Sequence, residues 1–263
     1  MKTLLPMILL LTVAVTAAAT EIEDRLDQAE AAYRAGKFDA ALMLLEPLID
    51  SKQPMPVAPR VKILVAQVLH SRGEDHFRHG RIAECVADFD RQVELQPGSA
   101  AEHWQRGIAY YYAEEFEKGA RQFALHRTVN PEDVENAAWH FVCIARGPQG
   151  TIEVARQKLM DVDHDSRVPM AQVQQMFAGT TTPQEVLHFG ESKGGMATFY
   201  AHLYVGLYFE AMGHTDKSLR MMQKAAENPD AKKSYMGDVA RVHVALRKKK
   251  SAHAQHVDAK HSR

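Results

Sequence analysis

A repeat with a spacing of 34 residues is the feature that most constrains the fold of this chain. Residues 100–131 match residues 66–97 when they are shifted back by 34 positions. Small residues recur where two helices would touch, and bulky residues recur where they would interlock. The matched pairs are Gly73 and Gly107, Ile82 and Phe116, Phe89 and Phe123, and Pro97 and Pro131. A fixed period of this size, closed by proline, is typical of stacked helix–turn–helix units.

Within residues 100–131 the apolar side chains follow the period of two amphipathic helices. The stripe of the first helix comprises Trp104, Gly107, Ile108 and Tyr111, and that of the second comprises Phe116, Ala120 and Phe123. Neither helix could bury its stripe alone, so each pair must stack on its neighbours.

Further copies predict an all-α solenoid that fills most of the chain. The predicted repeats are residues 22–50, 66–99, 100–133 and 199–230, with an irregular pair at 134–162, a helical insert at 164–195 and a capping helix at 235–247, all within a domain at 20–247. A terminal helix of this kind covers the exposed face of a last repeat.

The two ends of the sequence lie outside this array. Residues 1–19 combine a positive start, a short apolar run and a small-residue exit at Ala17–Ala19, which is the pattern of a secretory signal peptide. We therefore expect cleavage near Ala19 and export to the periplasm or the exterior; an uncleaved membrane anchor is the alternative. The tail, residues 248–263, is polar and basic, and its composition predicts disorder.

Composition excludes several classes of function. The chain has 263 residues, a net charge of −1 and 46% apolar residues, so bulk charge gives no steering toward nucleic acid. No later segment is apolar enough to insert stably in a membrane. Phosphate-loop, nucleophile-elbow, zinc-protease and CxxC motifs are missing from the sequence. We expect no catalysis, no cofactor and no metal, and we expect Cys85 and Cys143 to be buried apolar residues.

Three sequence patterns partly resemble metal sites. His76 and His79, and likewise His140 and Cys143, lie three positions apart and would share one helix face, but neither pair has further ligands nearby. A third pattern is the run DVDHDSR from Asp161, which alternates acids as calcium loops do, yet it lacks the glycine and the later acid of such loops. Surface or groove histidines and a polar loop are the readings we favour.

The first helices of the repeats carry the candidate binding residues. Tyr110, Tyr111 and Tyr112 are consecutive, so they cannot all point into the core, and some must face the concave groove or solvent. Polar side chains on the same type of helix could join them, and aromatic and arginine side chains are common interface anchors. The candidate set is His103, Arg106, Tyr110, Tyr111, Asn136 and His140.

Longer segments resemble one known family. The runs WQRGIAYYYAEEFEKGARQF, NPEDVENAAWHFVCIAR, RVPMAQVQQMF, FYAHLYVGLYFEA and YMGDVARVHVALR look like a tetratricopeptide-repeat (TPR)-like family of bacteria and of plastid-targeted plant proteins, over roughly residues 70–247. The resemblance implies a right-handed TPR-like α-solenoid throughout, and it brings no catalytic residues.

These observations predict a scaffold that binds a protein or peptide through its concave surface. A structural subunit of an assembly is one alternative. An enzyme with its site in the insert at 164–195 is another, and its sign would be a closed polar pocket with convergent ionisable groups. The sequence names neither the partner nor the oligomeric state.

Overall fold

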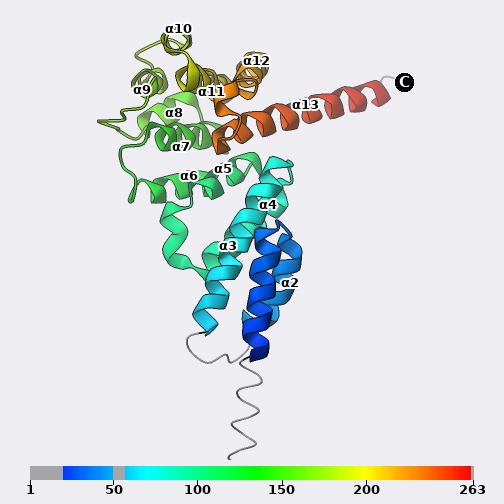
Figure 1. Ribbon diagram of the computed structural model, residues 1–263. Coiled ribbons are helices and arrows are strands. Elements are labelled where there is room, and N and C mark those ends of the chain that lie inside the picture. Colours follow the sequence, from blue (N-terminus) through cyan, green and yellow to red (C-terminus); the bar gives the residue numbers. More distant parts are fainter. Residues whose placement is uncertain (1–19, 50–56, 262–263) are drawn as a thin grey trace, which may run out of the picture. The chain divides into compact units, whose positions relative to one another are not determined.

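The computed structural model describes residues 20–49 and 57–261, and over these residues the chain is helical and contains no strand (Figure 1). The prediction of an all-α fold is therefore confirmed. The predicted signal peptide, residues 1–19, lies outside the described residues, as does most of the loop before the second repeat.

A helix over residues 20–34 comes first, and the later elements follow in close succession. They are α2 (Phe38–Ile49), α3 (Val57–Arg78), α4 (Ile82–Leu95), η1 (Pro97–Glu102), α5 (Trp104–Tyr112), α6 (Phe116–His126), α7 (Val134–Arg146), α8 (Ile152–Gln157), α9 (Met170–Ala178), α10 (Pro183–Lys193), α11 (Gly195–Ala211), α12 (Thr215–Ala226), η2 (Pro229–Ala231) and α13 (Tyr235–His261).

The chain forms two compact units. The first comprises the residues up to Gly73 together with Asp88–Pro97, and the second comprises Glu74–Ala87 and everything from Gly98 onward. In the first unit, leucines and valines of the helix over residues 20–34, of α2 and of α3 form a core cluster. The second unit holds the irregular pair, the insert and α13, and the sections below concern this unit.

Four of the described helical hairpins turn in the same way. The turn residue has a positive φ of 70° at Gly36, 69° at Gly80, 62° at Glu114 and 76° at Gly213. Its N–H donates to the carbonyl three positions earlier, and the next N–H donates to the carbonyl five positions before itself. This is the left-handed helix end that glycine makes easily, and Glu114 alone among these four carries a Cβ there.

The helices of three hairpins cross at a glycine that lies 16 positions before a bulky residue. A Cβ at the glycine would lie within 2.5 Å of the partner side chain in the first pair, 2.7 Å in the second and 3.1 Å in the third. The pairs are Gly73 with Phe89, Gly107 with Phe123, and Gly206 with Met222. The first two pairs differ by the 34 positions of the sequence repeat, so the period marks this close crossing.

Capping signals in the irregular region also appear as helix starts. Asp133 caps α7 by accepting the N–H of Glu135, and Thr182 forms a capping box with Glu185 at the start of α10. Asp before a helix, and Thr before a helix with Glu three positions later, are sequence signals for such starts. The insert is thus ordered, and its Phe177 packs edge-on against Phe141 of α7, with ring centroids 4.9 Å apart.

The last helix does more than cover a final repeat. Near its start, Tyr235 stacks on Phe77 at 5.4 Å; further along, His243 meets the hydroxyl of Tyr112 at 3.1 Å. Composition predicts disorder from residue 248, whereas α13 continues to His261. The physical reason is propensity: residues 248–261 contain no glycine or proline and are rich in Lys and Ala.

Among the described residues, no helix is both long enough and apolar enough to cross a membrane.

The close crossing predicts the effect of a single methyl group. Gly107→Ala should lower the free energy of unfolding by about 1–2 kcal/mol, because the buried Phe123 ring cannot move aside. Gly98→Ala is the matched control, since nothing lies within 4 Å of that position, and it should change stability by less than about 0.5 kcal/mol. Urea unfolding of the full chain measures both. Equal effects of the two substitutions would contradict the crossing.

The turn at Glu114 predicts a stabilising substitution. Glu114→Gly should raise the free energy of unfolding by about 1 kcal/mol, because glycine adopts φ 62° without the steric cost of a Cβ. The change also removes an exposed ion pair with Lys250 at 2.8 Å, which contributes little. Glu114→Ala removes the same pair and keeps the Cβ, so it should bring no gain. A glycine variant no more stable than the alanine variant would refute the strain.

Candidate functional site

All three consecutive tyrosines are buried, which corrects the expectation that some face a groove or solvent. Tyr110, Tyr111 and Tyr112 are 3%, 0% and 6% exposed. The ring of Tyr111 packs against Trp139 at 5.3 Å, and its hydroxyl accepts a hydrogen bond from Arg146 at 2.9 Å. The sequence argument failed because it left out α13 and α7, which cover the sides of α5 that a single hairpin would leave open.

The other predicted site residues differ from one another in burial and in the groups that they contact. His103 is buried, and Arg106 lies over the Tyr110 ring at 5.1 Å and donates to Gln122 at 3.1 Å. His140 is half-buried, and burial lowers its pKa to about 4. Of the six predicted residues, Asn136 alone lines the cavity described next. Ligand contact by the set stays a prediction.

A cavity of about 470 Å³ opens in the second unit between the start of α13 and helices α5, α6, α7 and α11. A volume of this size is typical of small-ligand and side-chain pockets, and here aromatic rings share the lining with a larger number of polar and charged groups. Its aromatic lining comprises Trp104, Phe123, Trp139, Tyr200 and Tyr235, and its polar lining includes Glu102, Asp133, Glu135, Asn136 and Arg167.

Helix geometry brings the acids of α7 to this cavity. Asn130 and Pro131 end the preceding segment, and the side chain of Asn130 donates to Asp133 at 3.0 Å. Asp133 caps α7, so Glu135 stands in its first turn, where a carboxylate is favoured by the helix dipole. Asn136 and, one turn later, Trp139 complete the contribution of this helix.

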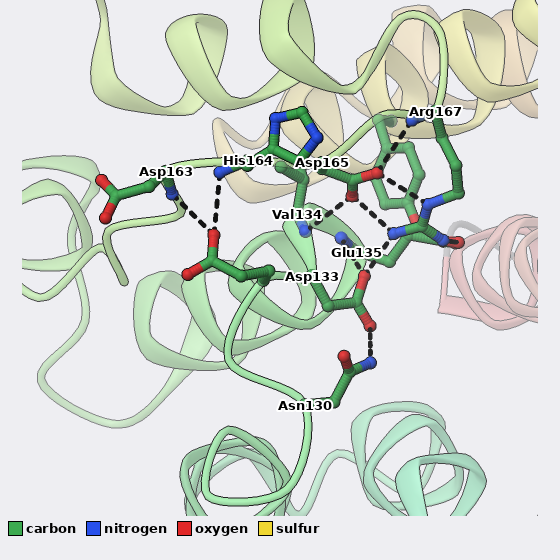
Figure 2. A network of polar contacts seen from close by, with 10 residues as sticks. Asn130, Asp133, Val134, Glu135, Asp163, His164, Asp165 and Arg167 are labelled. Atoms are coloured by element: carbon green, nitrogen blue, oxygen red, sulfur yellow. Dashed lines mark hydrogen bonds and ion pairs between the residues drawn. The ribbon is translucent and has the colours of Figure 1, made fainter.

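The guanidinium of Arg167 lies among three carboxylates (Figure 2). It donates from Nε to Asp165 at 2.9 Å and from Nη2 to Asp133 at 2.5 Å, and it also forms an ion pair with Glu135. Asp165 in turn accepts the backbone N–H of Val134 at 3.1 Å. The guanidinium of Arg167 therefore links the loop before α9 to the start of α7 through its contacts with three carboxylates.

The surroundings of Glu135 destabilise its ionised form. Burial raises its pKa to about 7, against the opposing effects of Arg167 and of a hydrogen bond from Tyr204. Asp133 and Asp165 add repulsion in the same direction as burial. Tyr200, whose own pKa rises to about 12 through burial and the neighbouring Glu135, lines the same cavity. Glu135 therefore changes charge near neutral pH.

Three buried polar atoms of the cavity-lining residues have no hydrogen-bond partner. They are Nε1 of Trp139, Oδ1 of Asn136 and the hydroxyl oxygen of Tyr235. Trp139 and Asn136 are only 2% and 4% exposed. Buried polar groups are nearly always satisfied; because these three atoms are closed to solvent, a ligand would reach them only after neighbouring side chains shift.

A second polar cluster, centred on Glu210, serves to join helices. Glu210 of α11 pairs with Arg146 of α7 at 2.5 Å and with Arg247 of α13, and its other oxygen meets His243 at 3.0 Å. Burial opposes ionisation, but hydrogen bonds from His243 and Arg247 outweigh it and hold the pKa of Glu210 well below its usual range. The cluster ties three helices of the second unit together.

Sequence reasoning missed the central residues of the cavity. None of Asp133, Glu135, Trp139 and Arg167 is among the residues that the sequence predicts to form a site. A usable signal was present: two acids open α7, and the acidic run that ends at Asp165 is followed at once by an arginine. The alternative of a site in the insert did point to the segment that holds Arg167.

Comparison with known proteins finds no matching family model and no curated protein that matches the chain. The TPR-like resemblance therefore stays a prediction. Among the described residues, no three His, Cys, Asp or Glu side chains gather as a metal site would require. Both cysteines are free and buried.

Glu135 makes stability depend on pH. Its pKa is raised from 4.5 to about 7, so the folded chain keeps a proton that the unfolded chain has lost, and this stabilisation disappears as the pH rises through that interval. Glu135→Gln mimics the protonated side chain. Relative to wild type, the variant should gain roughly 3 kcal/mol in the free energy of unfolding between pH 4.5 and 8. Urea unfolding at a series of pH values measures this difference; a constant difference would contradict the assignment.

Proposed function

We propose that this chain is a binding protein whose cavity receives a side chain from a protein or peptide partner. The observation that carries the proposal is the coincidence of aromatic walls, convergent charges and unpartnered buried polar atoms in one cavity of about 470 Å³. Aromatic anchors that enter pockets dominate the energetics of most interfaces. A pocket that already offers aromatic walls and unused hydrogen-bonding groups suits such an anchor.

The finer architecture forms part of the same proposal. A right-handed TPR-like solenoid would place its first helices in one row, and the recurring turns and 16-residue crossings support a repeat of this kind. Export through a cleaved leader of residues 1–19 would make the partner an extracytoplasmic one. N-terminal sequencing of the mature protein tests this, with Thr20 expected as the first residue.

Catalysis in the same cavity is a second candidate. Glu135 has a pKa of about 7, which is the range in which a general base works best. Against this, its two carboxylate oxygens already hold Arg167 and Tyr204. Turnover of a bound peptide, followed by mass spectrometry, would favour the enzyme over the binding protein.

The two tryptophans of the chain both line the cavity, so their fluorescence reports on it directly. A peptide selected from a random library on the immobilised protein should change this emission on binding. Trp104→Ala should weaken that peptide about tenfold, because it removes one wall. Phe209→Ala, on α11 but away from the cavity lining, is the matched aromatic control and should leave affinity unchanged. If the selected peptides bind wild type and Trp104→Ala with equal affinity, the proposal is wrong.

A further inference from the structure

We infer that the cavity selects a cationic group: the side-chain ammonium or guanidinium of a lysine or arginine in an extended peptide. This inference rests on the proposed function of the same cavity and names the chemistry that it recognises. Four observations carry it: the charge balance around Arg167, the geometry of the aromatic walls, the unpartnered acceptors and the exposed acid at Glu102.

The charge balance at the cavity is negative. Arg167 is surrounded by Asp133, Asp165 and Glu135, so three carboxylates face one guanidinium and two negative charges remain when all are ionised. Glu102, an exposed residue, adds another acid to the lining. The cavity lining includes no lysine and no arginine other than Arg167. A cationic ligand would therefore neutralise part of the surplus negative charge.

Arg167 is poorly placed to hold an anion instead. Its guanidinium already donates to Asp165 twice and to Asp133 and Glu135 once each. A guanidinium has five N–H donors in all. An acidic ligand would have to compete with three resident carboxylates and to approach their surplus charge, so acidic peptides and nucleic acids are disfavoured.

The aromatic walls suit a cation at the end of an aliphatic stem. Trp104 and Tyr235 meet edge to face, with ring centroids 5.1 Å apart and planes at 87°. Both rings are partly exposed and line the cavity. One face of Tyr235 is stacked on Phe77, so a cation would contact the ring faces that these packing contacts leave uncovered. Such a contact gains about 0.5–2 kcal/mol.

The unpartnered atoms add hydrogen-bonding groups of the right kind. Oδ1 of Asn136 is an acceptor that is closed to solvent, so an ammonium or guanidinium N–H would reach it only after that side chain shifts. The carboxylate oxygens of Glu135 each accept one hydrogen bond from the protein and have lone pairs to spare.

Binding should therefore depend on pH. Glu135 gains its negative charge as the pH rises through about 7, in the presence of Arg167, Asp133, Asp165, Tyr200 and Tyr204 around it. A cationic ligand should thus bind several-fold more tightly at pH 8 than at pH 6.

The test is a set of peptides that differ at one position. Fourteen-residue Gly/Ser/Ala host peptides carry Lys, Arg, Leu, Gln or Glu as the single guest residue, and tryptophan fluorescence of the full chain measures the dissociation constants. Lys and Arg guests should bind about tenfold more tightly than Leu and Gln, and Glu should bind least. Free cadaverine is a further probe, which separates a peptide side chain from a small amine.

Glu102→Arg and its control Glu227→Arg test where the peptide binds, and Glu135→Gln tests the origin of the pH dependence. Glu102→Arg should weaken the Lys peptide about tenfold, and Glu227→Arg, an exposed acid outside the cavity with the same change in net charge, should leave it unchanged. Glu135→Gln should remove the difference between pH 6 and pH 8. Since Glu102 is exposed, its substitution does not threaten folding.

The outcomes of these experiments distinguish failure of the cationic assignment from failure of the peptide-binding function. Preferential binding of Leu or Glu guests at the cavity would overturn the cationic assignment and leave the peptide-binding function standing. Cadaverine binding as tightly as the Lys peptide would support the cation site and overturn the peptide function. Binding of the Lys peptide that is equal in wild type and Glu102→Arg, or no binding of any probe, would overturn the inference.

Discussion

The close crossing of α5 and α6 is the constraint on which the second unit depends. Gly107 has no side chain, so the Phe123 ring sits where its Cβ would be, and the ring is held there on its other side by Trp139, which stacks on it at 6.2 Å with planes 18° apart. Phe123 and Trp139 both line the cavity. The feature that repeats along the sequence for packing thus also builds the inner wall of the candidate site, and a change in helix spacing would alter the cavity.

Two ionic clusters organise the rest of the second unit: the one at Glu210 is buried, whereas the one at Arg167 is partly exposed. Glu210 joins α7, α11 and α13 and leaves its carboxylate ionised between cations. Arg167 gathers three carboxylates and leaves the cavity with surplus negative charge. Buried charges are costly unless they are paired, so an unbalanced cluster beside a cavity is where a ligand would be stabilised most. The same chain therefore combines a balanced cluster suited to structure with an unbalanced one suited to recognition.

Much of the fold follows from the sequence, and the site follows from it only in part. The 34-residue period predicts the helix pairs, because it reflects packing within one hairpin, such as that of Gly107 against Phe123. The caps at Asp133 and Thr182 likewise depend on residues that are close in the sequence. The burial of Tyr112 and the extent of α13 were missed, because both depend on α13 reaching helices more than a hundred residues away in the chain. The role of Arg167 was missed for the same reason: its partners Asp133 and Glu135 lie over 30 residues earlier.

The indole N–H signals of Trp104 and Trp139 offer the most direct test of the central claim, that the cavity holds a cationic side chain. The nitrogen–proton spectrum of the full chain contains two indole signals, since the sequence has two tryptophans. On addition of a lysine-containing peptide, both signals should shift, because both tryptophans line the cavity. The matched leucine peptide should give comparable shifts only at about tenfold higher concentration. Equal shifts with the two peptides, or shifts with neither, would contradict the account.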